Sequence, residues 1–151
     1  MSFAEQMRAG ARARNMAVAL VIAALLPVAA LAQAIKVPNP ADLKKDGLKP
    51  LSDEQLKAAF SDATVYFQGT ATPTRVTFYY RTDGTRVGKL GGRTFEGKWW
   101  VKDGLRCEVS VRGGDLCAAV FREGDQYYHC AEGKDECEFE MRIVKGNKEG
   151  L

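Results

Sequence analysis

From Thr64 onward, apolar and polar side chains alternate along the chain with a period of two. Alternation of this kind is typical of β-strands that bury one face. It recurs in about eight short segments, most of them separated by turn signals such as Thr82-Asp83-Gly84 and Gly113-Gly114. Short strands joined by Gly/Asp turns predict an antiparallel meander, which forms a small up-and-down barrel or a strongly coiled sheet.

The pattern before the strands is helical. In residues 52–60, SDEQLKAAF, Ser52 is a good N-cap and Gln55 completes a capping box three positions later. Leu56 and Phe60 share one face of this segment. We therefore expect a mainly all-β protein with one short N-terminal helix that covers one end of the sheet or barrel.

The same alternation assigns side chains to faces, because successive residues of a strand point to opposite sides. The inward set is expected to contain Phe95, Gly97, Trp99, Val101, Leu105, Cys107, Val109, Val111, Tyr128, Cys130, Cys137, Phe139, Met141 and Ile143. The outward set is expected to contain Glu96, Lys98, Trp100, Lys102, Arg106, Glu108, Ser110, Tyr127, His129, Glu138, Glu140 and Arg142.

The four cysteines are predicted to form two disulfides. Cys107 and Cys117 bracket one predicted turn, and Cys130 and Cys137 bracket another. The spacing favours pairing 107–117 and 130–137, although four cysteines allow three connectivities. No C-x-x-C motif is present, which argues against a structural zinc site and a thioredoxin-like redox centre.

Residues 1–34 have the layout of a secretory signal peptide. Three arginines precede an apolar run from Met16 to Leu26, and small residues follow at Ala32 and Ala34. We expect cleavage after Ala34, with Ala32 as the second choice, and a periplasmic or secreted protein. An uncleaved membrane anchor is the alternative, although the unbroken run is shorter than the roughly 20 residues of a spanning helix. The export signal is then the only membrane-directed segment.

Cleavage after Ala34 leaves 117 residues, which suffice for a single domain. It removes three arginines and one glutamate, so the formal net charge falls from +3 to +1 and gives no reason to expect a nucleic-acid partner. We expect an extended lead-in over residues 35–51, one β-rich domain over residues 52–145 and a flexible tail over residues 146–151.

No pattern of catalytic residues appears in the sequence. The one histidine, His129, has no serine in a G-x-S-x-G motif to act with, and disulfides would consume every thiol. Metal, phosphate-loop and dinucleotide motifs are also missing from the sequence. We therefore expect a non-enzymatic protein without a metal or cofactor.

Outward aromatic side chains indicate a binding function instead. Trp100, Tyr79, Tyr127 and His129 are the candidates for an interaction surface. The first hypothesis is a protein-interaction or inhibitor-type module of the bacterial envelope, whose partner would be an envelope protein. The second is a calycin-like carrier of a small apolar ligand. It ranks lower because the expected inward side chains are bulky enough to fill a small barrel: Phe95, Trp99, Phe121, Tyr128, Phe139 and Met141.

Several of these segments together resemble a known family. They are L-S-x-E-Q-L (residues 51–56), F-Y-Y-R-T-D-G (78–84) and G-K-W-W-V-K-D-G-L-R-C (97–107), with a second cysteine ten residues later. Over roughly residues 50–122 the chain resembles small secreted proteobacterial proteins that are classed as a domain of unknown function. The resemblance implies export and a β-rich fold, and it implies no catalytic residue or substrate.

Overall fold

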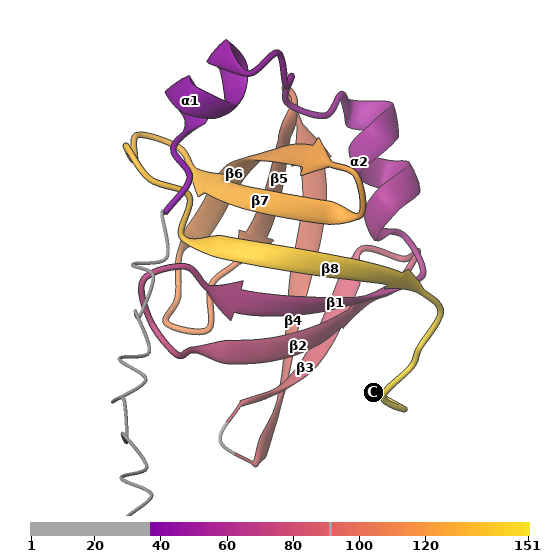
Figure 1. Ribbon diagram of the computed structural model, residues 1–151. Helices are drawn as coiled ribbons and strands as arrows, with labels where there is room; N and C mark the ends of the chain where they lie inside the picture. The colour runs from indigo at the N-terminus through magenta and orange to yellow at the C-terminus, as the bar shows by residue number, and fades with distance from the viewer. Residues whose placement is uncertain (1–36, 91) are drawn as a thin grey trace, which may run out of the picture. The chain divides into compact units, whose positions relative to one another are not determined.

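Eight antiparallel strands, each hydrogen-bonded to the next, form a closed barrel in the computed structural model (Figure 1). The structure describes residues 37–90 and 92–151. The strands are β1 (Ala63–Gly69), β2 (Arg75–Tyr80), β3 (Thr85–Leu90), β4 (Arg93–Lys102), β5 (Leu105–Val109), β6 (Asp115–Glu123), β7 (Gln126–Ala131) and β8 (Phe139–Lys145). The predicted all-β class is confirmed, and the sheet takes the barrel form.

Pairing of the last strand with the first closes the barrel. In this pair Val65 lies opposite Ile143, and Phe67 lies opposite Met141. All four side chains contribute to the interior core, together with aromatic residues from β2 and β4. Because a closed barrel has no free strand edge, the backbone hydrogen bonds of the sheet are completed within it.

Helix α2 (Asp53–Phe60) covers one end of the barrel, as the sequence predicts. Ser52 caps the helix, and the capping box with Gln55 is complete. Leu56 and Phe60 are fully buried and pack in the interior core. The Phe60 ring lies edge-on to that of Tyr80, with centroids 5.3 Å apart.

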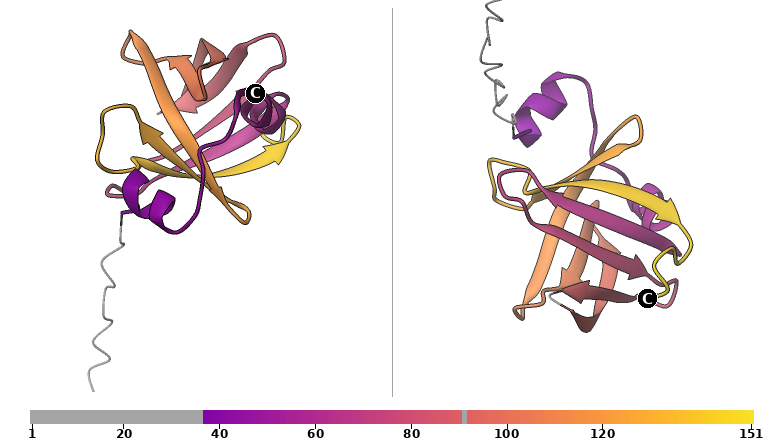
Figure 2. Two further views of the ribbon diagram at one scale, coloured as in Figure 1. Left: turned by 90° about the horizontal axis from the view of Figure 1, so that it is seen from above. Right: turned by 60° about the horizontal axis from the view of Figure 1, so that its bottom comes forward.

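The lead-in, predicted to be extended, contains a second short helix, α1 (Pro40–Lys45). The Asn39 side chain caps it, and Pro40 occupies the first turn, where a missing N–H costs nothing. The two helices lie apart on the barrel (Figure 2). Beyond α1 the lead-in follows β6, where the Leu51 N–H donates to the carbonyl of Val120 at 2.8 Å.

The lead-in and α1 cover part of the outside of the barrel, so the sheet has a second buried surface. Its side chains, which we call the outer cluster, are Leu43, Leu48, Ala119, Phe121, Tyr128, Cys130 and Cys137. Among the predicted inward residues, Tyr128, Cys130 and Cys137 therefore lie outside the barrel. Phe121, which was expected to fill the interior, also belongs to this cluster.

Both favoured disulfides are present, Cys107–Cys117 and Cys130–Cys137. Cys107 and Cys117 face each other on β5 and β6, with Cα atoms 4.1 Å apart. Cys137 lies in the connection before β8, and its N–H donates to the carbonyl of Pro38 at 2.9 Å. The second disulfide therefore links the β7–β8 connection to β7, and the hydrogen bond places this connection next to the lead-in. Two disulfides indicate an oxidising, extracytoplasmic environment.

The predicted faces hold in some strands and are reversed in others. On β4 the alternation is as predicted, with Trp99 in the interior core and Lys98 exposed. On β5 and β7 the assignment is wrong, because Arg106, Glu108 and His129 are buried inside the barrel. Cys107 and Cys130 are buried as expected, but they lie on the outer face of the sheet. Each of them forms a disulfide there.

The C-terminal residues 146–151, predicted to be a flexible tail, make contacts with β1. The Lys148 N–H donates to the Thr64 hydroxyl at 2.9 Å, and the Tyr66 hydroxyl donates to a carboxylate oxygen of Glu149 at 2.7 Å. The predicted signal peptide lies outside the described residues. Neither described helix has the length and hydropathy needed to span a membrane.

Replacing Phe60 with alanine should lower the free energy of unfolding by about 3–5 kcal/mol, because it empties the position that closes one end of the core. Lys57→Ala, at an exposed position of the same helix, is the control and should change stability by less than about 0.5 kcal/mol. Urea unfolding followed by tryptophan fluorescence measures both. Equal, small effects would contradict the assignment of α2 as a closing element.

Candidate functional site

A buried ionic cluster lies inside the barrel. Arg106 and Glu108 are two residues apart on β5, so both side chains point inward. Nη1 of Arg106 donates to Glu108 Oε2 and to the hydroxyl of Tyr80, 2.6 Å away. The Tyr80 hydroxyl donates to Glu108 Oε2 at 2.9 Å. Nη2 of Arg86, on β3, lies 3.5 Å from Glu108 Oε1 and donates to the carbonyl of Val109 at 2.6 Å.

His129 extends this cluster from β7. Its Nδ1 lies 2.8 Å from Nη2 of Arg106. A guanidinium can only donate, so Nδ1 accepts and the imidazole proton belongs to Nε2. Burial, assisted by the positive charge of Arg106, lowers the pKa of His129 to about 3. The ring is therefore neutral near pH 7 and presents Nε2–H as a donor.

The interior cluster holds more positive than negative charge. Burial alone would raise the pKa of Glu108, but the charges of Arg106 and Arg86 hold it below its usual range, so the carboxylate is ionised. Both guanidiniums are charged at any physiological pH. With His129 neutral, two positive charges face one negative charge within the barrel.

Aromatic rings surround both guanidiniums. The Arg86 guanidinium carbon lies 4.2 Å from the Phe78 ring centroid and 5.2 Å from that of Phe95. The Arg106 guanidinium carbon lies 5.1–5.6 Å from the ring centroids of Phe60, Phe67 and Tyr80. Gly88, opposite Phe78, makes room for this arrangement, because a Cβ there would come within 2.3 Å of the Phe78 ring. Cation–π contacts recover part of the hydration that the buried cations lose.

The cluster leaves hydrogen-bonding capacity unused. The Nε atoms of Arg86 and Arg106 are buried without a hydrogen-bond partner among the described residues. Both polar contacts of Arg86 described above are made by Nη2. Buried donors in native proteins are usually satisfied, so unpaired ones require an explanation, and an ion or ligand that accepts from them is one.

A cavity of about 590 Å³ lies above this cluster, at the barrel end opposite α2. Arg86, Glu108 and His129 reach it from below and form its floor. Its lower wall is aromatic, with Phe67, Phe78 and Phe139. The β1–β2 and β7–β8 connections, at the left of Figure 1, form part of its rim. The cavity is therefore polar at the bottom and apolar along its wall.

Exposed hydrophobic side chains gather at the rim of the cavity. The large hydrophobic residues that are exposed within residues 37–90 and 92–151 are Leu90 at 44%, Val111 at 42% and Leu116 at 39%. All three line this cavity: Leu90 ends β3, and Val111 and Leu116 belong to the β5–β6 hairpin. An exposed apolar rim around a concave site is typical of a ligand-binding surface.

The four predicted interaction residues do not form one surface. Trp100 and Tyr79 are partly exposed on the outside of β4 and β2, two strands that β3 separates. The Tyr79 hydroxyl donates to a carboxylate oxygen of Asp62 at 2.7 Å. Tyr127 packs against the interior core, and His129 is only 3% exposed. The prediction that these last two residues face outward is wrong, because β7 has the opposite face assignment.

Sequence reasoning did not find the floor of the cavity. Arg86, Arg106 and Glu108 alternate with apolar residues, and charged residues in that pattern are ordinarily solvent-exposed. The exposure of Leu90, at the end of β3, is likewise not predicted by a period-two pattern. Only the closing of the strands brings these residues together.

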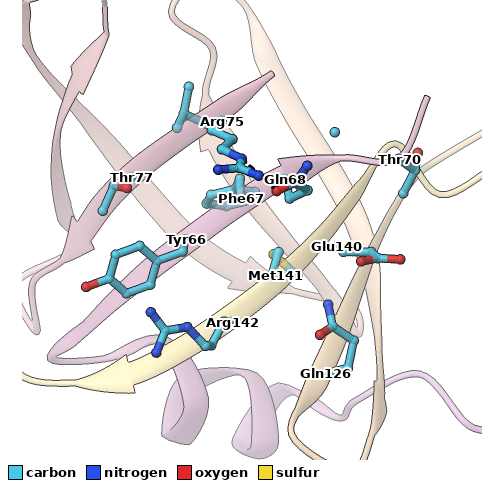
Figure 3. Close-up of a pocket in the computed structure, with 12 residues that line it drawn as sticks. Tyr66, Phe67, Gln68, Thr70, Arg75, Thr77, Gln126, Glu140, Met141 and Arg142 are labelled. Atoms are coloured by element: carbon cyan, nitrogen blue, oxygen red, sulfur yellow. Dashed lines mark hydrogen bonds between the residues drawn. The ribbon is translucent and has the colours of Figure 1, made fainter. Parts of the chain in front are cut away.

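A second hollow, of about 540 Å³, lies on the outer face of β1, β2 and β8 (Figure 3). There the Arg142 guanidinium stacks on the Tyr66 ring, 4.5 Å from its centroid. Arg75 Nε donates to the side-chain carbonyl of Gln68 at 2.9 Å. These polar side chains already pair with one another at the surface, so the barrel cavity is the better candidate site.

Other site chemistries find no support among the described residues. Within residues 37–90 and 92–151, no group of three or more His, Cys, Asp and Glu side chains is arranged to hold a metal ion. The two disulfides use all four cysteines, so no free thiol is present. Comparison of the chain with protein-family models, curated proteins and solved structures finds no match. The resemblance to secreted proteins of unknown function thus stays a prediction, and the site is interpreted from its own geometry.

His129 should stay neutral in the folded protein far below the usual histidine range. Since folding holds its pKa near 3 and the unfolded chain protonates near 6.5, the free energy of unfolding should fall as the pH is lowered through this interval. This one group should contribute a slope of up to ~1.4 kcal/mol per pH unit.

With one histidine in the chain, NMR titration of the imidazole resonances measures this pKa directly. The control for stability is His129→Gln, which keeps a hydrogen-bond acceptor for Arg106 and should have a shallower pH dependence above about pH 4. An imidazole that titrates near pH 6.5 in the folded protein would contradict the buried, neutral assignment.

Proposed function

We propose that this protein is an exported, non-catalytic carrier that binds a small, largely apolar ligand in the open end of its barrel. The observation that supports it most strongly is the cavity of about 590 Å³ with exposed leucine and valine side chains at its rim. Water contact with these side chains is unfavourable, and a ligand that covered them would gain roughly 25 cal/mol for each Å² of apolar area removed from water.

The packing of the barrel interior favours a carrier over a protein whose barrel is completely filled by side chains. Six bulky side chains that the sequence places inside would leave little room for a ligand. Two of these, Phe121 and Tyr128, lie in the outer cluster instead. Helix α2 and the core around Trp99 occupy only the opposite end, which leaves space beneath the rim.

The protein-interaction or inhibitor-type function is a separate proposal with a separate location. It depends on the outer face, where Trp100 lies opposite Cys107 and is partly exposed. Trp100 and Leu116 therefore discriminate between the two functions, because they lie on different surfaces of the molecule.

The carrier proposal can be tested with 1-octanol, a small neutral probe with an apolar tail. Leu116→Glu should weaken octanol binding about tenfold, because it puts a charge at the apolar rim. Trp100→Ala, on the outer face, is the control and should leave octanol affinity unchanged while the protein stays folded. Isothermal titration calorimetry measures both. Octanol binding that is absent, or that depends on Trp100 instead of Leu116, would contradict a barrel site.

Export supplies the setting for this proposal. The two disulfides are consistent with a periplasmic or secreted protein, and we propose cleavage after Ala34 because residues 1–34 have the layout of a signal peptide. Intact-mass spectrometry of protein from its own host should give a chain that begins at Ile35 and lacks four hydrogens. A mass that retains residues 1–34 would instead support the uncleaved anchor.

A further inference from the structure

The floor of the cavity carries buried charge that the protein does not balance. Arg86 is 1% exposed and Arg106 is fully buried, yet they share the single carboxylate of Glu108. An uncompensated charge in a protein interior is strongly destabilising unless a counter-ion reaches it. The rim also carries Glu136 and Glu138, but both are exposed, and water and salt screen exposed carboxylates far more strongly than buried groups.

The donors at the floor suit an anion and not a cation. The negative charge of Glu108 is already shared by two guanidiniums, since Oε2 accepts from Arg106 and Tyr80 while Oε1 lies 3.5 Å from Nη2 of Arg86. A cationic head group would therefore meet a cluster whose net charge is already positive. Arg86 has a guanidinium whose polar contacts use only Nη2, and His129 contributes Nε2–H. Both residues line the cavity.

The wall above these donors suits an apolar tail. Phe67, Phe78 and Phe139 lie next to the floor, and the exposed hydrophobic rim lies beyond them. A molecule that places a charged head at the floor would place its hydrocarbon against the aromatic wall and under the rim. Head and tail would then each meet groups of matching polarity.

We propose that the ligand of this barrel is an amphipathic monoanion, with a carboxylate-type head held by Arg86 and His129 and a short apolar tail that extends toward Leu90, Val111 and Leu116. This inference rests on the proposed carrier function and adds the chemical class of the ligand. A carboxylate matches the guanidinium because two oxygens can accept from its fork of donors. Its charge would also balance the excess positive charge of the cluster.

The test compares three probes that share one tail: octanoate, 1-octanol and octylammonium, titrated calorimetrically into the disulfide-bonded mature protein near pH 7. Octanoate should bind at least tenfold more tightly than octanol, and octylammonium should bind no more tightly than octanol. Arg86→Gln should abolish the advantage of octanoate. Arg75→Gln makes the same charge change on the outer face of the barrel and should leave that advantage intact.

A second readout does not depend on a variant that folds. Octanoate should shift the imidazole resonances of His129 in the wild-type protein, and octanol should shift them less. Near-ultraviolet circular dichroism shows whether Arg86→Gln keeps the native core; if it does not, the His129 shift decides alone.

Each outcome has a separate meaning. Octanol that binds as tightly as octanoate, or octanoate that leaves His129 unshifted, would overturn the anion assignment and leave the carrier function standing. Failure of all three probes to bind would overturn the carrier function itself.

Discussion

The carboxylate of Glu108 is the group on which the barrel interior depends. It accepts hydrogen bonds from Arg106 and Tyr80 and lies beside Arg86, so one side chain of β5 connects β2, β3 and β5 across the barrel. Without it, two guanidiniums would lie inside the sheet with no negative charge near them. Loss of one member of a buried ion pair is commonly costly for this reason.

This cluster also explains why the two ends of the barrel differ. Toward α2, the Tyr80 ring packs edge to face with Phe60 and with the indole of Trp99, Phe60 lies tilted against Trp99, and the three fill the core. Toward the other end, a charged and hydrogen-bonded floor takes the place of such packing, and the cavity begins above it. Apolar side chains that lie beyond a polar floor have no core to join, so they remain exposed at the rim.

Apolar side chains are buried on both faces of the sheet, and this burial offsets the cost of a polar interior in so small a domain. The lead-in and α1 form the outer cluster over β6 and β7, and the Cys130–Cys137 disulfide lies within it. A small domain buries a limited fraction of its surface, and covalent links add stability without any further core. The protein can therefore leave one barrel end open for the ligand that we propose.

Local rules determined much of this protein from its sequence. Period-two alternation and Gly/Asp turns predict the strands, the capping box of Ser52 and Gln55 predicts α2, and the spacing of the cysteines favours the pairs that form. These features depend on residues that are close together in the chain. The Asn39-Pro40 start of α1 is equally local, although the prolines and lysines around it suggest an extended segment.

Only the tertiary structure decided which face of each strand points into the barrel. Alternation separates the side chains of β5 into two sets but does not say which set is inside when both are buried. Cys107 is apolar and was expected inside, whereas the interior holds Arg106 and Glu108, because β2 and β7 supply hydrogen-bond partners for Arg106 and β3 supplies the positive charge of Arg86 beside Glu108. Those partners lie 20 or more residues away in sequence, and closure of the barrel brings them into contact. The candidate site therefore forms only when the barrel closes, and no local sequence pattern predicts it.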